Sequence, residues 1–453
     1  MVAQDPPVQR RQASGMFGER FARTFRGAAA QALSRVIMMV LPLVTIPLTI
    51  NYLGHERFGM WMAISSLSAL FAVTEGGISN ALITPVAQAN ALRDDGAIRR
   101  LLASAMALIV PVAVVIGCLA LCAGGLVPWR SVLNLKSDLA VREAAPVFQI
   151  LGAAVAISFV SSAGLKMRRG LNHIAAVATW ETLGALLAVP ALLAATVLKL
   201  GTPWLAAALL LTPQAVNLFG LAVFFARRRM YVPSLRDVER AAVRRLMRSG
   251  AMFLTASLAS AVVIGLDPMF IAKVGSAEDV SQFAVAQRLF GLPFVLANFW
   301  FYSQWPIHAE ALHRGEIGWV RSSFLAALGG SAAMSAAIAL TLVAGFGVIT
   351  KLWIGTAMHP GALLLWSMAA YSILTVVTGA CSMLIYALEA RREQTVIMAL
   401  TILCVVPLKI ALLHLFLPAG AVLATVIVYL AVQVIPFAII IPRRLRARQA
   451  LAV

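Results

Sequence analysis

Twelve long apolar runs, bounded by polar or basic residues, lie between residues 36 and 442 and constrain the fold more than any other feature. In hydrocarbon, every backbone N–H and C=O group must be paired within the chain. Runs of this length therefore form helices, and about 20 residues cross a bilayer. The sequence lacks the short alternating segments of a transmembrane barrel. It predicts an all-α integral membrane protein with about 12 transmembrane helices.

Composition supports this class, because hydrophobic residues make up 61% of the chain and charged residues only 12%. A soluble domain needs more charge to cover its surface. The expected spans lie near 36–54, 59–83, 103–127, 145–166, 174–197, 203–226, 250–273, 283–306, 322–347, 361–386, 395–417 and 420–442.

The two halves of the chain contain similar motifs at similar intervals. Pro47, Gly54 and Glu56 are echoed by Pro268, Gly275 and Glu278, and the tetrapeptide at 89–92 is echoed at 309–312. Six expected helices separate the copies, so both have the same orientation. This is a parallel repeat, and it predicts two six-helix bundles around a central cavity.

The expected organisation follows from this repeat. It comprises a cytoplasmic N-terminus at 1–35, a first bundle at 36–226, a basic cytoplasmic linker at 227–248, a second bundle at 249–442 and a basic cytoplasmic tail at 443–453. In the N-terminal segment, Phe17, Phe21 and Phe25 recur every four residues with arginines between them. This pattern predicts an amphipathic helix on the membrane surface.

Basic residues are distributed unevenly between the expected loops. If the N-terminus is cytoplasmic, the inner segments hold 27 Lys and Arg residues and the outer loops hold seven. By the positive-inside rule, both termini of this multi-pass protein then face the cytoplasm. The net charge of +19 comes from residues that flank spans, so we expect no nucleic-acid partner. The first residues show no cleavable signal peptide.

Ionisable residues inside the expected spans are the first candidates for function, because burying charge in a membrane is costly. Asp267 and Arg288 lie at similar depth in the seventh and eighth spans, and we expect them to pair. Lys409 follows Pro407 in the eleventh span, where a diphosphate or a carboxylate of the other bundle would neutralise it. Further cavity candidates for substrate binding or coupling are Glu75, Glu181, Gln214, Asn217 and Asn298. Interhelical hydrogen bonds account for the three amides equally well.

Motifs of catalysis are missing from the sequence, and we expect no enzyme. The acidic turn at 93–96 has no metal-binding loop beside it, and the six histidines show no metal spacing. All four cysteines fall within apolar runs and are interpreted as packing residues. Without a phosphate-binding glycine loop, energy would come from a proton or sodium gradient or from the substrate gradient. No cofactor or metal is expected.

Residues 42–96, with a Leu-Gly turn, a following Phe-Gly-Met-Trp and an acidic residue before glycine, carry a family resemblance. This stretch resembles the first hairpin of the polysaccharide-transporter branch, which includes O-antigen flippases, of the multidrug/oligosaccharidyl-lipid/polysaccharide (MOP) superfamily. Residues 249–290 are similar to its seventh and eighth helices, and 306–321 to its inner loop. Glu75 departs from the pattern, which has aspartate there.

The resemblance implies a flippase that moves undecaprenyl-diphosphate-linked oligosaccharides across the inner membrane for O-antigen, exopolysaccharide or capsule synthesis. The implied partners are the lipid-linked oligosaccharide, membrane lipids and other polysaccharide-assembly proteins. Two alternatives stay open from the sequence. One is a cation-coupled multidrug exporter of the same architecture. The other is a membrane glycosyltransferase, polymerase or ligase, which would need larger polar loops than the chain contains.

Overall fold

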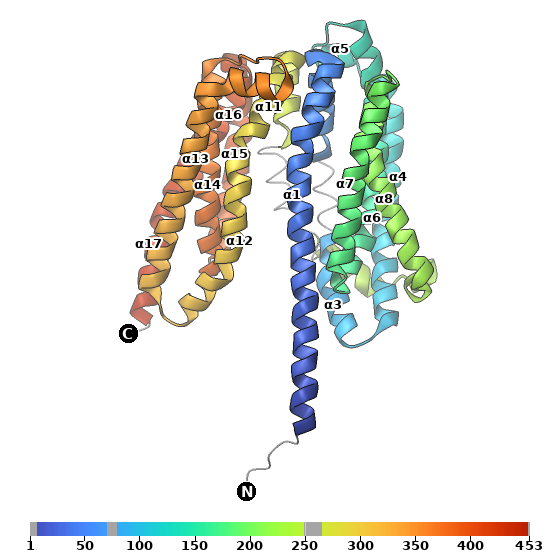
Figure 1. Ribbon diagram of the computed structural model, residues 1–453, viewed down its shortest axis with the longest axis vertical. Coiled ribbons are helices and arrows are strands. Elements are labelled where there is room, and N and C mark those ends of the chain that lie inside the picture. Colours follow the sequence, from blue (N-terminus) through green and yellow to red (C-terminus); the bar gives the residue numbers. More distant parts are fainter. Residues whose placement is uncertain (1–6, 70–78, 249, 251–264, 452–453) are drawn as a thin grey trace. The chain divides into compact units, whose positions relative to one another are not determined.

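The computed structural model describes residues 7–69, 79–248, 250 and 265–451, and all regular structure in these ranges is helical (Figure 1). Ten helices within them are long and apolar enough to cross a membrane. The remaining two expected spans, near 59–83 and 250–273, include residues outside the described ranges. The prediction of an all-α, multi-pass membrane protein is confirmed, with the number of spans approximate.

The first half of the chain is built mainly from long helices joined by short turns. It contains α1 (Pro7–Ser66), α3 (Ile83–Ala91), α4 (Asp95–Leu126), α5 (Trp129–Val132), α6 (Asp138–Gly170), α7 (Ile174–Val197) and α8 (Thr202–Arg227). After α8 come two short 3₁₀ helices, η1 (Arg229–Tyr231) and η2 (Leu235–Asp237), and a helix at 240–248. We call residues 228–248 the connector.

The second half is likewise built mainly from helices joined by short turns. It contains α10 (Asp267–Val274), α11 (Ala277–Phe290), α12 (Leu292–His313), α13 (Ile317–Ile354), α14 (Ala362–Ala387), α15 (Arg391–Phe416), α16 (Pro418–Val428), a π-helical segment η4 (Tyr429–Val434) and α17 (Ile435–Leu451). The expected span at 283–306 is divided at Gly291, where α11 ends and α12 begins. Pro293 lies at the start of α12, a position where the missing N–H group is tolerated.

Gly54 divides α1 into two helical segments. Its φ of 76° and ψ of 170° lie outside the helical region, and glycine adopts such a φ without the strain of a side chain. The chain turns at Leu53-Gly54, as the sequence predicts, and the second helical segment begins immediately afterwards.

The chain divides into two compact units, each with its own packed helices. The first unit is Met1–Thr45, Thr74–Gly125 and Pro146–Leu254. In it α7 packs along α8, and the helices approach closely at Gly184, where an added Cβ atom would lie 2.9 Å from the Cα atom of Pro213. Small residues permit such close helix packing in membranes.

The second unit is Ile46–Val73, Leu126–Ala145 and Thr255–Val453, so it includes two segments from the first half of the chain. Within this unit, α14 packs against α12, α13 and α16, and α15 packs against α16. Buried side chains such as Phe301, Leu384 and Phe437 form one apolar cluster at the centre of this packing. Within this unit, one cluster of polar residues lies in the apolar interior and another lies at its edge.

Candidate functional site

Asp267 and Lys409 form an ion pair inside the second unit. The exposed fraction is 5% for Asp267 and 0% for Lys409. Asp267 is in the first turn of α10, where backbone N–H groups favour a negative charge. Lys409 comes from α15, two residues after Pro407, which removes one backbone hydrogen bond from that helix. Each charge offsets the cost of burying the other, so neither is tolerated alone.

Two tyrosines lie close to this pair. The rings of Tyr371 in α14 and Tyr429 at the start of η4 have centroids 6.3 Å apart, and both hydroxyls are within electrostatic range of Asp267. Further along η4, Gln433 donates a hydrogen bond to the hydroxyl of Thr401, with 3.3 Å between the heavy atoms. π-Helical turns occur often at functional sites. The ion pair is therefore the centre of a small polar cluster within an apolar bundle.

The expected pairing of Asp267 with Arg288 was wrong. The carboxylate of Asp267 pairs with Lys409, while Arg288 lies half-buried in α11. Lys409 does meet a carboxylate, but one in its own unit and not in the other bundle. Sequence spacing estimates the depth of a residue along its helix, whereas the direction of its side chain depends on how the helices pack. Depth alone therefore selected the wrong cation.

The other expected site residues are dispersed among the helices. Glu181 in α7 accepts hydrogen bonds from Arg169 at both carboxylate oxygens, at 2.7 and 2.8 Å. The amides differ in burial, because Asn217 is buried in α8 while Gln214 and Asn298 are half-buried. Glu75 lies outside the described residues.

Arg168 is a buried cation that sequence reasoning missed, because it was counted among the charges of an inner loop. It lies in the last turn of α6 with an exposed fraction of 3%. Its guanidinium lies over the ring of Phe224, 5.3 Å from the centroid, and is 3.5 Å from the carbonyl oxygen of Gly220. No sequence signal separates Arg168 from its neighbour Arg169, since only the packing of α8 decides which one is buried.

A second polar cluster joins segments that are distant in sequence at the end of the second unit that we expect to face outward. Glu56 accepts hydrogen bonds from the backbone N–H groups of Lys136 and Ser137, at 2.5 and 3.0 Å. Glu278, the equivalent acid of the second half, lies 4.0 Å from the ammonium of Lys136. The side-chain amide of Asn134 donates to three carbonyl groups at the C-terminal end of α10. The acids of the two repeats thus meet at one loop.

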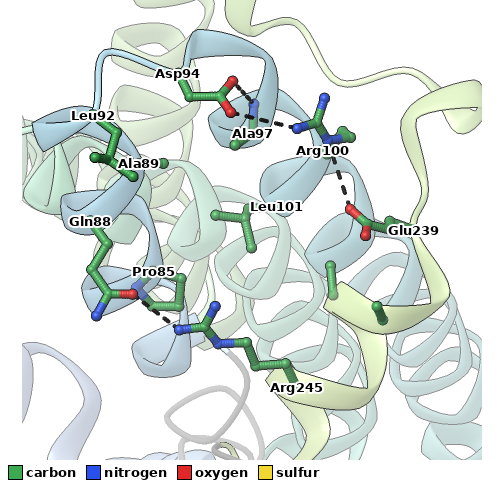
Figure 2. Close-up of a pocket in the computed structure, with 12 residues that line it drawn as sticks. Pro85, Gln88, Ala89, Leu92, Asp94, Ala97, Arg100, Leu101, Glu239 and Arg245 are labelled. Carbon is green, nitrogen blue, oxygen red and sulfur yellow. Dashed lines mark hydrogen bonds and ion pairs between the residues drawn. The ribbon is translucent and has the colours of Figure 1, made fainter.

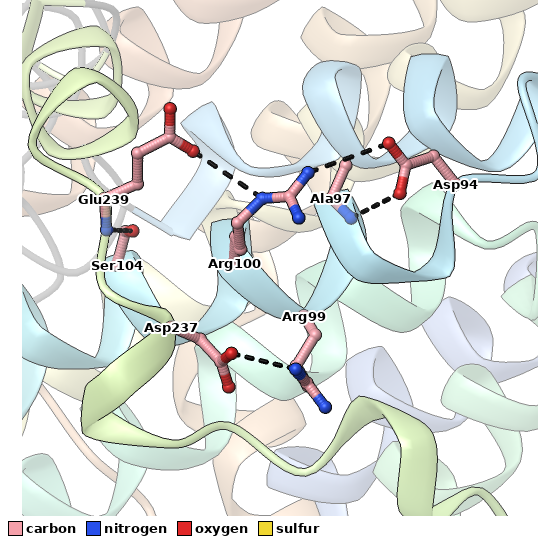
Figure 3. A network of polar contacts seen from close by, with 7 residues as sticks. All are labelled: Asp94, Ala97, Arg99, Arg100, Ser104, Asp237 and Glu239. Atoms are coloured by element: carbon pink, nitrogen blue, oxygen red, sulfur yellow. Dashed lines mark hydrogen bonds and ion pairs between the residues drawn. The ribbon is translucent and has the colours of Figure 1, made fainter.

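A third cluster, within the first unit, holds the connector to α4 (Figure 3). Arg99 pairs with Asp237 at 2.9 Å, and Arg100 lies 3.7 Å from both Asp94 and Glu239. Beside it is a pocket of about 330 Å³, lined by α3, α4 and the helix at 240–248, where Arg245 donates to the side chain of Gln88 (Figure 2). Both arginines of the cluster are paired with carboxylates, so the cluster holds the connector to α4.

Comparison with known proteins agrees with this architecture. The sequence model of one family, described as polysaccharide biosynthesis protein, matches residues 24–311, more than half of the chain. No curated protein matches the chain.

Among solved structures, the chain is similar to an inward-facing multidrug resistance MATE family transporter of the MOP superfamily. The TM-score is 0.71 with 16% identity, over 93% of this chain and all of that one. It is also similar to the lipid II flippase MurJ, with a TM-score of 0.68 and 12% identity over 93% and 90% of the two chains. A MOP superfamily transporter from Pyrococcus furiosus gives a TM-score of 0.55 and 17% identity over 94% and 95%. These likenesses establish the fold of MOP transporters, and the family match shows that the chain belongs to the polysaccharide biosynthesis protein family.

Proposed function

We propose that this protein is a flippase that moves a lipid-linked oligosaccharide, an undecaprenyl-diphosphate saccharide, across the bacterial inner membrane. The product would serve O-antigen, exopolysaccharide or capsule synthesis. The observation that carries the proposal is the match to the polysaccharide biosynthesis family over residues 24–311. The MOP transporter fold supports it, because one solved structure with this fold is a lipid II flippase.

The physical task explains why such a protein is needed. Sugar hydroxyls and a diphosphate cannot enter hydrocarbon unaided, because they would lose water without compensating hydrogen bonds. A cavity that opens alternately to each side would carry the head group while the prenyl tail stays in lipid. This work makes and breaks no covalent bond, so we propose a transporter without enzymatic activity, acting beside other polysaccharide-assembly proteins. Both termini would face the cytoplasm.

Buried cations are the feature of the site that suits a diphosphate. Lys409 and Arg168 are both buried in membrane-spanning helices, and Arg288 is half-buried. A charge-assisted hydrogen bond to phosphate is strong where water is scarce. Lys409 is the best candidate, because its ion-pair partner is a carboxylate that a diphosphate can replace.

Exchange of partners at Lys409 gives the proposal a mechanism. In the resting protein Asp267 neutralises Lys409. When the head group enters, the diphosphate would take the ammonium, and Asp267, left without its cation, would bind a proton. Release of the head group on the other side would restore the pair and free the proton. Transport would then be coupled to a proton gradient, with sodium as the alternative ion.

The test must separate transport from folding, since removing one partner of a buried pair leaves the other charge uncompensated. The useful variant is therefore Asp267→Asn combined with Lys409→Met, which removes both charges and keeps similar volumes. In a strain that lacks the native protein, this double variant should reach the membrane at normal abundance yet restore less than a tenth of the surface polysaccharide. Normal polysaccharide from the double variant would overturn the role of Lys409.

Two controls complete the experiment. Lys409→Arg keeps the charge with a changed geometry and should retain partial activity. Resistance to cationic drugs, measured in the same strains, should not depend on Asp267. An exporter predicts the reverse, with drug resistance dependent on Asp267 and polysaccharide unaffected.

A further inference from the structure

The connector helix at 240–248 has two faces of different chemistry. Ala242 and Leu246 are buried within the first unit, with exposed fractions of 8% and 0%. On the opposite side Arg240, Arg244 and Arg248 are exposed. Residues four positions apart are neighbours on a helix surface, so the three guanidinium groups form one row.

Apolar side chains accompany this row. Met247 is 56% exposed, and Val243 is half-buried. With the three arginines they line a hollow of about 630 Å³, and we call these five residues the basic face. Cationic groups beside exposed apolar side chains are typical of helices that lie in a membrane interface.

The arginines of the basic face differ from those of the neighbouring polar cluster. Arg99 and Arg100 are neutralised by Asp94, Asp237 and Glu239 (Figure 3). Among the ion pairs of the described residues, none includes an arginine of the basic face. Three positive charges on one exposed row therefore remain for an anion outside the protein.

The depth of the helix follows from two hydrogen bonds. The backbone N–H of Glu239 donates to the hydroxyl of Ser104 at 3.0 Å, and Ser104 is the second residue of the expected span at 103–127. Arg245 donates to Gln88 at 3.0 Å (Figure 2), and Gln88 lies about 7.5 Å beyond the expected end of the second span, at ~1.5 Å per residue. If the spans end where the sequence predicts, the basic face lies near the edge of the hydrocarbon, at the level of the headgroups.

We propose that the basic face binds the phosphate headgroups of anionic phospholipids, with Met247 and Val243 against their acyl chains. Soluble phosphate would gain nothing from the apolar side chains. The row from Arg240 to Arg248 is about 12 Å long, at ~1.5 Å per residue, which suits several adjacent headgroups better than the single diphosphate of one prenyl lipid. Lipid bound here would hold the connector at the membrane surface. The inference stands whether or not the transported substrate is a saccharide.

The test uses the purified full-length protein in nanodiscs of phosphatidylcholine with 20% phosphatidylglycerol, about the content of a mildly anionic membrane. Native mass spectrometry counts the phosphatidylglycerol molecules that stay bound. The variant Arg240→Gln/Arg244→Gln/Arg248→Gln should bind phosphatidylglycerol with a loss of about fivefold per arginine, since each basic residue near an anionic surface contributes about that factor. The matched control is Arg228→Gln/Arg229→Gln/Arg236→Gln, which removes the same charge from the same connector but leaves the basic face intact and should lose much less binding.

A salt titration of the wild type keeps the test valid if the triple variant misfolds. Bound phosphatidylglycerol should fall steeply between 0.1 M and 1 M salt, because the screening length shrinks from about 10 Å to 3 Å. Equal losses in the two triple variants, or binding that ignores salt, would overturn the proposal. Farnesyl diphosphate, added as a competitor, should displace phosphatidylglycerol only when its concentration is comparable with that of phosphatidylglycerol. Displacement at a tenth of that concentration would overturn the assignment in favour of a prenyl-diphosphate site.

Discussion

Lys409 in α15 and Asp267 in α10, 142 positions apart in the sequence, form an ion pair in the interior of the second unit. The pair therefore joins two helices that are not consecutive in the chain. Since both groups are buried, the packing tolerates the complete pair or the absence of both charges, but not one charge alone. Loss of either charge leaves the other in a medium that cannot solvate it.

We expect strong coupling between these two residues in a double-mutant cycle. Asp267→Asn or Lys409→Met alone should each lower the free energy of unfolding by about 3–5 kcal/mol, whereas the double variant should recover most of that loss. Thermal unfolding in detergent gives the comparison. As the matched control, Arg288→Gln should add to Asp267→Asn without recovery. Additive losses for Asp267 and Lys409 would show that the pair does not form.

The loop at Asn134 should control how tightly the outward end of the second unit is closed. Asn134 has a φ of 47° and its amide binds three carbonyl groups of α10 and the residue after it. Asn134→Asp keeps the shape and the backbone preference but places a carboxylate against those oxygens. A cysteine introduced at Val274 should then react faster with a membrane-impermeant thiol reagent, in a background without the native cysteines. Asn134→Gly should give an intermediate rate, and unchanged rates in both variants would show that the Asn134 hydrogen bonds do not hold the end of α10 in place.

The hydroxyl of Tyr231 should lose its proton only at a pH above the ordinary range for tyrosine. Its hydroxyl donates to Asp95 at 2.6 Å, and burial, followed by this carboxylate, raises the pKa of Tyr231 to about 12. A raised folded-state pKa stabilises the protein fully below the unfolded value near 10, and this contribution is lost as the pH rises through 12. The difference in phenolate absorbance between wild type and Tyr231→Phe should therefore appear only above pH 11. Tyr231→Phe should lower the free energy of unfolding by about 2 kcal/mol at pH 8. Phenylalanine does not titrate, so the variant lacks the absorbance change of residue 231. A difference spectrum with a midpoint near pH 10 would contradict the buried contact.

The charge asymmetry predicts which ends of the helices face the cytoplasm. Reporter fusions at positions 55, 135 and 355 should give outer signals, and those at 95, 237 and 450 inner signals. Contacts within each unit agree with these two sets of positions. Asn51 donates to the carbonyl of Ile354 and Glu56 contacts Lys136, all near expected outer positions, whereas Arg99 pairs with Asp237 near expected inner ones. An inner signal at 135 would break the assignment for the first half.

Much of the fold was predictable because hydropathy is set by the membrane and not by packing. The expected spans at 174–197 and 203–226 correspond closely to α7 and α8. The third was shorter than its helix, since α4 starts at Asp95 and its polar first turns carry no hydrophobic signal. The break at Gly291 and the π-helical turn at Tyr429–Val434 were also missed, because both depend on how neighbouring helices pack.

The candidate site was only partly predictable. The cost of burying charge singled out Asp267 and Lys409, and both are indeed buried. Their pairing was missed because it requires the rotation of α10 and α15 about their axes, which one sequence does not contain. Arg168 was missed for the opposite reason, since a cation at a helix end normally reaches water. The 3% exposed fraction of Arg168 and its position over Phe224 show that it does not.

The most direct test of the account is a flipping assay with the purified protein. Vesicles with a proton gradient would contain a fluorescent undecaprenyl-diphosphate oligosaccharide, and an impermeant quencher would report the fraction that moves between leaflets. The wild-type protein should move the labelled lipid fast, whereas the folded double variant Asp267→Asn/Lys409→Met should give only the rate of protein-free vesicles. A wild-type protein that leaves the labelled lipid in place while it transports a cationic drug through the same vesicles would contradict the proposed function.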